Sequence, residues 1–491
     1  MPSLSFSLIL DLRRELKRTN AEVLTWGCDN YDDRIKQWSD LRDVYTGAVV
    51  RVSSSEDVTV VVGFATNHRI PLAVKGGGYS TSGASTTQGG ILLDLSNLRT
   101  VRVEGVSNII IAAGGALWDD IDVAAAQYHL AVVGTTLNRI GVAGATLGGG
   151  YGWLTGQYGL AIDNLLWAKM VLADGSQVIT SQDQNPDLFW AIRGAGQSFG
   201  VAVELAFRGH TQNHPVFAGT LRFSAERLPD IVTFANRFEA LTDGRQGFWF
   251  GFTLRPSTNI CDILVVIFHN GDQFAAEQFF SPLFSCQPIF NNAQLLPYDS
   301  LNSILNAGDT CFRRSDLSSV NATYQTERNF GARKCLGGSN VALPLDPKLI
   351  ESIFRQFDEL LRVYPQARDS GLFFEFIPNV QVRKIANDAT SFASRGPYYN
   401  VSSLFRWHGM DLDQKMQSAQ RDLMERIGNE AGIASKPDYN TFSKGTGLYA
   451  NYALHNTPLQ AVFGANIPRL RELKMKYDPH NTFRRWHGLV V

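Results

Sequence analysis

Two glycine-rich stretches decide the fold: Lys75-Gly-Gly-Gly-Tyr-Ser-Thr-Ser-Gly83 and Gly141-Val-Ala-Gly-Ala-Thr-Leu-Gly-Gly-Gly-Tyr-Gly152. Successive glycines allow positive φ angles, so that neighbouring backbone N–H groups can turn toward one point and form an anion-binding nest. The first stretch follows a strand predicted at Pro71–Val74, where a phosphate-binding turn belongs. The second is longer than a turn requires, which favours an extended or planar ligand against bare backbone. Tight loop packing is the alternative, and two such stretches beside strands disfavour it.

Neither stretch is a common nucleotide motif. Gly194-Ala-Gly-Gln-Ser-Phe-Gly200 is similar to GxGxxG, but its last spacing is one residue too long. It also follows a helix predicted at Asp187–Arg193, whereas a dinucleotide fingerprint follows a strand. The sequence has no GxxxxGK[ST] either. It therefore predicts neither a Rossmann site nor a P-loop.

Residues 45 to about 212 alternate short β-branched runs with helical patterns. Continuous apolar runs bounded by turn residues predict strands that are buried on both faces. The strands are expected at Val49–Val52, Pro71–Val74, Ile91–Leu95 and Ile109–Ala113, with a helix at Glu56–Asn67 between the first two. This texture is typical of an α/β domain.

The middle region, from about 213 to 445, has longer segments in which apolar and polar residues alternate. These predict strands at Phe248–Leu254, Ile263–Phe268, Leu372–Ile377 and Val401–Trp407. Amphipathic helices are predicted at Leu228–Leu241, Pro347–Val363 and Asp413–Glu430. Half-buried strands with helices to one side indicate an antiparallel sheet covered on one face. The last region, Gly447–Val491, is compact and aromatic and contains a predicted helix at Pro468–Lys476.

The length, charge balance and apolar runs of the chain limit the classes of function that it can have. With 491 residues the chain is too long for one ordinary core, which predicts two domains. Lys and Arg total 45 against 46 for Asp and Glu, so the chain lacks the basic excess that binds nucleic acid. No stretch approaches the length of uncharged apolar sequence that a membrane span needs.

The opening residues and the cysteines bear on the compartment. The start, MPSLSFSLILDLRREL, has no basic region and no small-residue cleavage site, so it predicts the first helix and no signal peptide. The cysteines form no CxxC pair and no metal-ligand spacing; they are Cys28, Cys261, Cys286, Cys311 and Cys335. Scattered cysteines in odd number favour reduced thiols. We therefore expect a cytoplasmic protein without a bound metal.

An ordered set of further motifs begins near residue 50 and continues into the C-terminal region. They are Ser55-Glu-Asp-Val58, Leu93-Asp-Leu95, Tyr158-Gly-Leu-Ala-Ile-Asp-Asn164, Ala173-Asp-Gly175, Asn185-Pro-Asp-Leu-Phe-Trp-Ala-Ile-Arg-Gly194, Phe199-Gly-Val201, Tyr449-Ala-Asn-Tyr452 and Tyr477-Asp-Pro-His-Asn-Thr-Phe483. Together with the glycine stretches, this set resembles the FAD-binding proteins of the p-cresol methylhydroxylase (PCMH) and vanillyl-alcohol oxidase superfamily. Within that superfamily it is similar to the berberine-bridge-enzyme-like branch.

The resemblance implies an α+β fold: a PCMH-type FAD-binding domain of two subdomains, and a substrate domain with an antiparallel sheet covered by helices. The FAD-binding domain would comprise residues 1–212, with its core at about 45–212, and a C-terminal segment, 447–491, that returns to it. Residues 213–446 would form the substrate domain over the isoalloxazine ring.

Two positions depart from the family. Most relatives attach FAD through a histidine after the first glycines, where this chain has Tyr79, and bicovalent members add a cysteine where it has Leu137. Neither side chain can form the usual linkage, so we predict non-covalent FAD held by backbone nests and packing, in a milder oxidant than the covalent relatives. The residues expected to hold FAD are Lys75, Gly76, Gly77, Gly78, Tyr79, Ser80, Gly83, Leu137, Gly141, Gly144, Thr146, Gly149, Gly150, Gly152, Asp163, Val201 and Asn451.

Hydride removal from a C–H or O–H bond also needs a base for the proton. Tyr452 is the first candidate, since relatives place a catalytic tyrosine at this Asn-Tyr position; packing against the flavin is its alternative. Glu375 is the second, because in Phe373-Phe-Glu-Phe-Ile377 it shares a strand face with apolar residues, which predicts a raised carboxyl pKa. A substrate-domain glutamate is the base in berberine bridge enzyme. An ion pair with Arg395 or Arg406 is the alternative for Glu375.

Two further residues have candidate roles. His408 follows the predicted strand Val401–Trp407 and is a third catalytic candidate, against the alternative of a structural histidine. Asn451 is expected to orient the flavin or the backbone and not to perform chemistry.

These expectations favour an FAD-dependent oxidase or dehydrogenase that acts on a small, largely apolar natural product such as an alkaloid or a polyketide. The resemblance implies hydride transfer to FAD and reoxidation by O2, in secondary-metabolite biosynthesis. Two alternatives stay open. One is a flavin-retaining isomerase or cyclase that uses acid/base groups without net redox change, and the other is a non-catalytic flavin- or ligand-binding protein.

Overall fold

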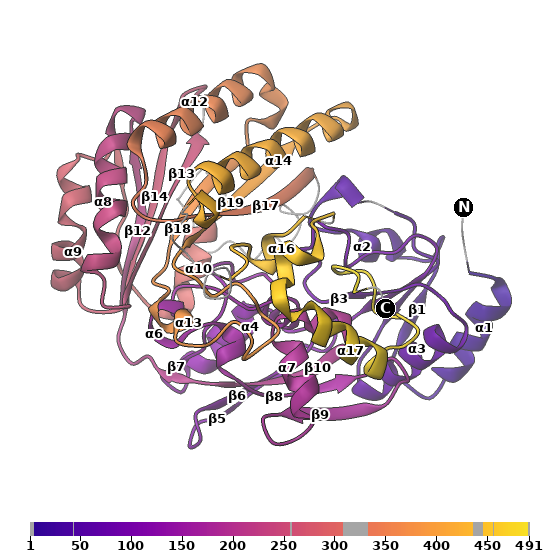
Figure 1. The fold of residues 1–491 in the computed structure, drawn as a ribbon. Helices are drawn as coiled ribbons and strands as arrows, with labels where there is room; N and C mark the ends of the chain where they lie inside the picture. Colours follow the sequence, from indigo (N-terminus) through magenta and orange to yellow (C-terminus); the bar gives the residue numbers. More distant parts are fainter. Residues whose placement is uncertain are drawn as a thin grey trace.

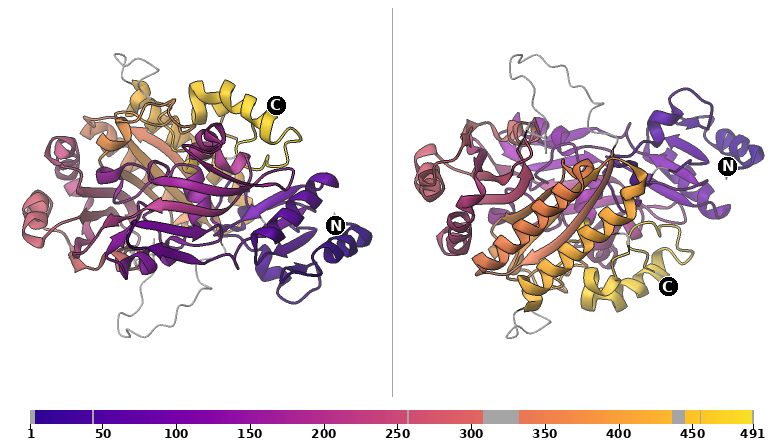
Figure 2. Two further views of the ribbon diagram at one scale, coloured as in Figure 1. Left: turned by 90° about the horizontal axis from the view of Figure 1, so that it is seen from below. Right: turned by 90° about the horizontal axis from the view of Figure 1, so that it is seen from above.

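The fold is α+β, as the family resemblance implied, with three main sheets (Figure 1). It is seen in a computed structural model that describes residues 4–42, 44–255, 258–307, 332–435, 445–454 and 456–489. Two of the sheets belong to the N-terminal half of the chain, and the third and largest belongs to the middle region. The C-terminal segment lies against the N-terminal half and not against its sequence neighbours on the outer helices (Figures 1 and 2).

The first sheet contains the parallel strands that the sequence predicts. Its order is β1 (Glu22–Leu24), β2 (Ala48–Arg51), β4 (Ile91–Asp94) and β3 (Leu72–Lys75). Strands β2, β4 and β3 are parallel, and β1 is antiparallel to β2. Helix α3 (Ser55–Asn67) follows β2 and begins with a capping box formed by Ser54 and Asp57. The glycine stretch after β3 therefore leaves the carboxyl end of a buried strand.

The second sheet is antiparallel throughout. Its order is β5 (Val101–Glu104), β6 (Ile109–Ala113), β10 (Val201–Arg208), β8 (Leu165–Val171) and β9 (Gln177–Ser181). Edge strand β5, which the sequence did not predict, differs from the buried strands in that its residues alternate between half-buried and exposed. An antiparallel edge strand needs only one covered face, and that gives this alternation.

One core joins the second sheet to the C-terminal segment. Trp118 and Phe207 share this core with Phe463, Leu470 and Trp486. The later residues belong to α16 (Leu459–Phe463), α17 (Ile467–Tyr477) and the coil after them.

A buried ammonium group fastens the C-terminal segment. Lys474 Nζ lies 2.7 Å from an Asp478 carboxylate oxygen and donates to the carbonyls of Ser198 and Phe483 at 2.6 and 2.9 Å. Both side chains of the ion pair are fully buried. The C-terminal segment is thus part of the same folded unit as the second sheet.

The third sheet has eight antiparallel strands. Its order is β15 (Phe290–Asn291), β12 (Val216–Phe223), β14 (Cys261–His269), β13 (Gln246–Leu254), β18 (Gly371–Phe376), β19 (Tyr399–Trp407) and β17 (Arg333–Val341), and β16 (Gln294–Leu296) also pairs with β12. One face is covered by helices α8 (Leu228–Leu241), α9 (Gln273–Ser285), α12 (Pro347–Val363) and α14 (Asp413–Glu430) (Figure 1). Their apolar sides and the strands form one aromatic-rich core.

Two properties of the described residues complete the fold. No helix among them has the length and apolar character needed to cross a membrane. Cys28, Cys261, Cys286 and Cys335 are free thiols, and Cys311 lies outside the described residues.

Candidate active site

Glu375 lies on the face of the large sheet that is turned toward the FAD-binding domain. Successive residues of a strand point to opposite faces, and Leu372, Phe374 and Phe376 point into the core beneath the helices. Glu375 points the other way and is only 2% exposed. The strand position predicted for it is therefore confirmed.

Two hydroxyl groups donate to the Glu375 carboxylate. Ser402 Oγ, from the neighbouring strand β19, donates to Oε1. Tyr452 Oη lies 3.2 Å from each carboxylate oxygen. Burial raises the pKa of Glu375 to about 7, although the two hydrogen bonds act in the opposite direction.

The alternative of an ion pair for Glu375 is wrong. Arg395 instead forms a buried ion pair with Asp163, at 2.7 Å, and the same carboxylate accepts a hydrogen bond from the backbone N–H of Leu160. Arg395 is thereby used to order the loop that contains Asp163. Glu375 has hydroxyl partners, which leave its carboxylate able to take up a proton.

Tyr452 reaches Glu375 from the C-terminal segment. It ends a short 3-10 helix, Ala450–Tyr452, and passes close to β17, where a Cβ atom at Gly338 would lie 2.5 Å from the Cβ of Tyr452. Burial and the adjacent Glu375 carboxylate raise the pKa of Tyr452 well above its ordinary value. The phenol is therefore a hydrogen-bond donor at neutral pH.

Asn451 and Tyr449 hold the second glycine stretch in place. The Asn451 amide donates to the carbonyl of Ala145 at 2.9 Å and to Tyr449 Oη at 2.8 Å. Tyr449 Oη in turn accepts the N–H of Gly150 at 3.2 Å. A Cβ atom at Gly148 would lie 2.1 Å from Asn451 Oδ1. Asn451 thus orients the backbone of the second glycine stretch, which is one of the two roles expected for it; the other is to orient the flavin.

The two glycine stretches meet and fit a cofactor that lies on bare backbone. A Cβ atom at Gly77 would lie 2.7 Å from the N atom of Gly141, and one at Gly141 would lie 2.6 Å from the N atom of Gly77. Beside this contact Gly144 has open space around the position of a Cβ atom. The hydroxyl of Thr146 is buried without a hydrogen-bond partner among the described residues. A surface of glycines with an unused hydroxyl is suited to FAD.

The second stretch is not bare backbone throughout. Residues Val142–Leu147 form helix α5, with Gly141 as its N-cap. The run that follows is irregular, and Gly149 and Gly150 have φ angles of 129° and 73° that favour glycine. Within this stretch, bare irregular backbone of the kind expected to contact a planar or extended ligand occurs only after α5.

The other residues predicted to hold FAD have varied settings. Lys75 donates to the carbonyls of Arg34 and Lys36, both at 2.8 Å, so its ammonium group supports the loop. Val201 is buried in the apolar core beside β8, and Leu137 is 37% exposed. The remaining predicted residues lie in or beside the two glycine stretches; they are Gly76, Gly78, Tyr79, Ser80, Gly83 and Gly152. The contacts of all these residues with FAD stay predictions.

His408 is not part of the site. It follows the last residue of β19 and is exposed. The residue of β19 that pairs with Glu375 is Asn400, near the opposite end of the strand. The prediction that His408 faces the substrate is therefore wrong, because β19 ends at Trp407 on the side away from the carboxylate.

Two residues of the site were missed from the sequence. Ser402 is an ordinary serine in a predicted strand, and only the pairing of β18 with β19 brings it to Glu375. Tyr151 donates its hydroxyl hydrogen to the carbonyl oxygen of Glu375 at 3.3 Å. The Gly-Gly-Gly-Tyr-Gly motif that ends at Gly152 contains Tyr151 and was the available signal.

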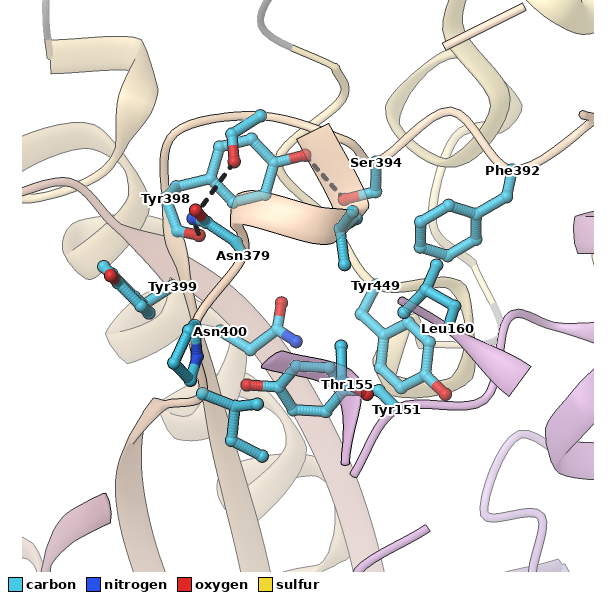
Figure 3. A pocket seen from close by; sticks show the side chains of 14 residues that line it. Tyr151, Thr155, Leu160, Asn379, Phe392, Ser394, Tyr398, Tyr399, Asn400 and Tyr449 are labelled. Atoms are coloured by element: carbon cyan, nitrogen blue, oxygen red, sulfur yellow. Dashed lines mark hydrogen bonds between the residues drawn. The ribbon is translucent and has the colours of Figure 1, made fainter. Parts of the chain in front are cut away.

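A pocket opens next to this group of side chains (Figure 3). It lies between the loop after the second glycine stretch and the strands β18 and β19. It is lined by Tyr151, Thr155, Leu160, Ile377, Pro378, Asn379, Val382, Phe392, Ser394, Gly396, Tyr398, Tyr399, Asn400 and Tyr449. Since Asn400 pairs with Glu375 in the sheet, the pocket lies directly beside the carboxylate.

Two regions of the chain match models of known protein families. Residues 46–181 match the FAD binding domain family, and residues 448–489 match the family described as berberine and berberine like. Among curated relatives, the FAD-linked oxidoreductase pgmH of Aspergillus terreus is 28% identical over 470 residues, which is 94% of this chain and 92% of the relative. The FAD-linked oxidoreductase hasG of Aspergillus fumigatus is also 28% identical, over 94% of this chain and 95% of its own.

Solved structures show the same fold. 6-Hydroxy-D-nicotine oxidase from Arthrobacter nicotinovorans has a TM-score of 0.77 at 22% identity, over 96% of this chain and 98% of its own. Berberine bridge enzyme, in a variant bound to (S)-reticuline, has a TM-score of 0.78 at 17% identity, over 99% of both chains. The chain is thus an FAD-linked oxidoreductase whose residues 46–181 match the FAD binding domain family and whose residues 448–489 match the berberine-like family, in a fold shared with these oxidases.

Proposed function

We propose that this oxidoreductase oxidises a small natural-product-like molecule, with Glu375 as the final proton acceptor and Tyr452 as the group that contacts the substrate. The observation that carries the proposal is the Tyr452 hydroxyl, 3.2 Å from both oxygens of a buried carboxylate. When bound, FAD supplies acceptance of a hydride, with O2 as the proposed final oxidant.

The pKa shifts of Glu375 and Tyr452 support the roles proposed for the two residues. A carboxyl group with a pKa of about 7 is ionised in a large fraction of molecules at neutral pH and can still take up a proton. The pKa of Tyr452 is raised, so this phenol does not ionise first. A substrate proton would pass to the Tyr452 oxygen as Tyr452 passes its own proton to Glu375. Ser402 keeps the receiving oxygen in position.

We also propose that FAD is held without a covalent bond, in an enzyme of secondary-metabolite biosynthesis. Glucooligosaccharide oxidase from Acremonium strictum, with a TM-score of 0.78, is described with a cysteinyl and histidyl FAD. This chain has Tyr79 and Leu137 where the family pattern has those attachment residues. Relatives named FAD-linked oxidoreductases come from Aspergillus terreus, Alternaria solani and Penicillium roqueforti.

The attachment is tested first, by visible absorbance before and after acid precipitation. Yellow colour that moves completely into the supernatant is the expected result, and colour left in the pellet would contradict non-covalent binding. The reaction is tested next by O2 uptake and product mass on a panel of natural-product phenols and amines. We expect O2 uptake with loss of two hydrogens. A product of unchanged mass without O2 uptake would instead support the isomerase or cyclase.

The base is tested with Glu375→Gln and Tyr452→Phe. On the substrate found, both should lower kcat/KM by a factor of roughly 10²–10⁴, the usual contribution of a positioned acid or base. For the wild type, kcat/KM should rise with pH through about 7 as Glu375 ionises, and Glu375→Gln should remove this rise. Full activity of both variants would refute the assignment.

A further inference from the structure

The pocket beside Glu375 has aromatic walls. Tyr151 and Tyr449 meet with ring centroids 6.0 Å apart and an angle of 52° between their planes. Phe392 and Tyr449 meet at 6.2 Å and 63°. These three rings come from the second glycine stretch, from the segment after β18 and from the C-terminal segment, and they line one pocket (Figure 3). Such walls favour a flat ring as the occupant.

Charge is missing from the pocket lining. Among the residues that the structure describes, those lining the pocket include no Asp, Glu, Lys, Arg or His side chain. The nearest charged groups are already used: Arg395 lies 5.4 Å from the Phe392 ring but is paired with Asp163, and Glu375 accepts from Ser402 and Tyr452. An ammonium or carboxylate group would lose its hydration there without gaining an ionic partner in the pocket lining.

Asn400 supplies an unused polar group. Within the described part of the chain its side-chain amide has no hydrogen-bond partner, and among the other lining residues Asn379 Oδ1 and Tyr399 Oη also lack one. Tyr398 Oη and Ser394 Oγ are 2.8 Å apart, and Asn379 donates to the carbonyl of Tyr398 at 2.8 Å. Asn400 lies directly across from Glu375 in the pairing of β18 with β19. An amide both donates and accepts, so it can bind a hydroxyl or a carbonyl oxygen.

We infer that this pocket binds the ring of a neutral, oxygen-bearing aromatic substrate, as in phenolic polyketides, and that Asn400 recognises the ring oxygen. The inference rests on the proposed function and narrows its substrate class, because it excludes the cationic amines of alkaloids. A ring held by Asn400 lies near Glu375, which pairs with Asn400 in the sheet. It also lies near Tyr452, whose ring centroid is 4.9 Å from that of the lining residue Tyr449.

The test measures binding and not turnover. Dissociation constants of 2-naphthol and of 2-(aminomethyl)naphthalene, an ammonium at neutral pH, are measured on the FAD-loaded protein by calorimetry. We expect 2-naphthol to bind at least roughly tenfold more tightly. Asn400→Ala should weaken the binding of 2-naphthol by roughly three- to tenfold, which corresponds to the loss of one hydrogen bond. Asn400→Asp should shift the preference toward the ammonium. Asn429→Asp, exposed on α14, makes the same change of charge away from the pocket and should alter neither constant.

The outcomes test the neutral-substrate inference and the proposed function separately. Equal or tighter binding of the ammonium by the wild type overturns the neutral-substrate inference, and unchanged binding in both Asn400 variants overturns the role of Asn400. If the binding preference holds while Glu375→Gln oxidises an identified substrate at the wild-type rate, the inference stands and the proposed function fails. If a cationic amine is oxidised with the pH profile given above, the proposed function stands and the inference fails.

Discussion

Replacement of Glu375 by Gln should change how the stability of the protein depends on pH. The folded protein holds the Glu375 proton with a pKa of about 7, against 4.5 for an ordinary glutamate. The pKa is raised on folding, so the contribution to stability is fully present below pH 4.5 and is lost as the pH rises through about 7. Gln does not ionise, and the variant should lack this loss.

The magnitude follows from the two pKa values. Their difference corresponds to about 3 kcal/mol of unfolding free energy between the fully protonated and the fully ionised limits. Glu375 is 2% exposed, so solvent screening does not reduce this value as it would at the surface. Between pH 5 and pH 9 the wild type should lose about 2–3 kcal/mol of unfolding free energy relative to the variant.

The assay is urea unfolding followed by circular dichroism at these two pH values, with the same excess of FAD. The comparison of each variant with the wild type cancels the groups that both proteins share. Glu359→Gln, at an exposed position of α12, is the matched control, and its difference from the wild type should not change with pH. A pH-independent difference for Glu375→Gln would refute the buried, proton-binding carboxylate on which the proposed base depends.

Three further substitutions test other contacts of the site and the core. Ser402→Ala removes a hydrogen-bond donor that lowers the pKa of Glu375, so the midpoint of the rise of kcat/KM with pH should move upward by about one pH unit. Ser402→Thr keeps the hydroxyl group and should have the wild-type midpoint. An unchanged midpoint in Ser402→Ala would contradict this role of Ser402. Gly338→Ala puts a Cβ atom 2.5 Å from the Cβ of Tyr452 and should cost about 1–3 kcal/mol of stability together with most of kcat, measured by thermal unfolding and turnover. Lys474→Met leaves a buried carboxylate unpaired and should cost about 3–5 kcal/mol; an unchanged melting temperature would count against the anchoring role.

Three of the four helices that cover the large sheet could be predicted from the sequence, and α9 was missed. The ranges expected for α8, α12 and α14 are those observed, because each helix has an apolar stripe of helical period and covers one face of a sheet. The bounds predicted for strands β2 and β3 differ from those observed by one residue. Short apolar runs between turn residues leave few alternatives for where these strands lie. The antiparallel order of the second sheet was not foreseen, because strand direction depends on partners far away in sequence.

The site was predicted in its components and not in its assembly. Tyr452 was proposed from its motif and Glu375 from strand alternation, yet nothing in the sequence indicated that the two would touch. Ser402 joins them only through the register of β18 and β19. His408 was misplaced for a related reason: the end of the strand at Trp407 was predicted correctly, but periodicity does not show which end of a strand approaches a pocket.

The return of the C-terminal segment to the FAD-binding core has a consequence for biosynthesis. Phe463, Leu470 and Trp486 pack against Trp118 and Phe207, yet they are translated after the whole substrate domain. Until they emerge from the ribosome, the earlier side of this core lacks its covering residues and Tyr452 has not reached Glu375. Domains fold as units during synthesis, so the large sheet and its helices can form before the second sheet acquires its full core. Uptake of the cofactor should therefore follow translation of the C-terminal segment.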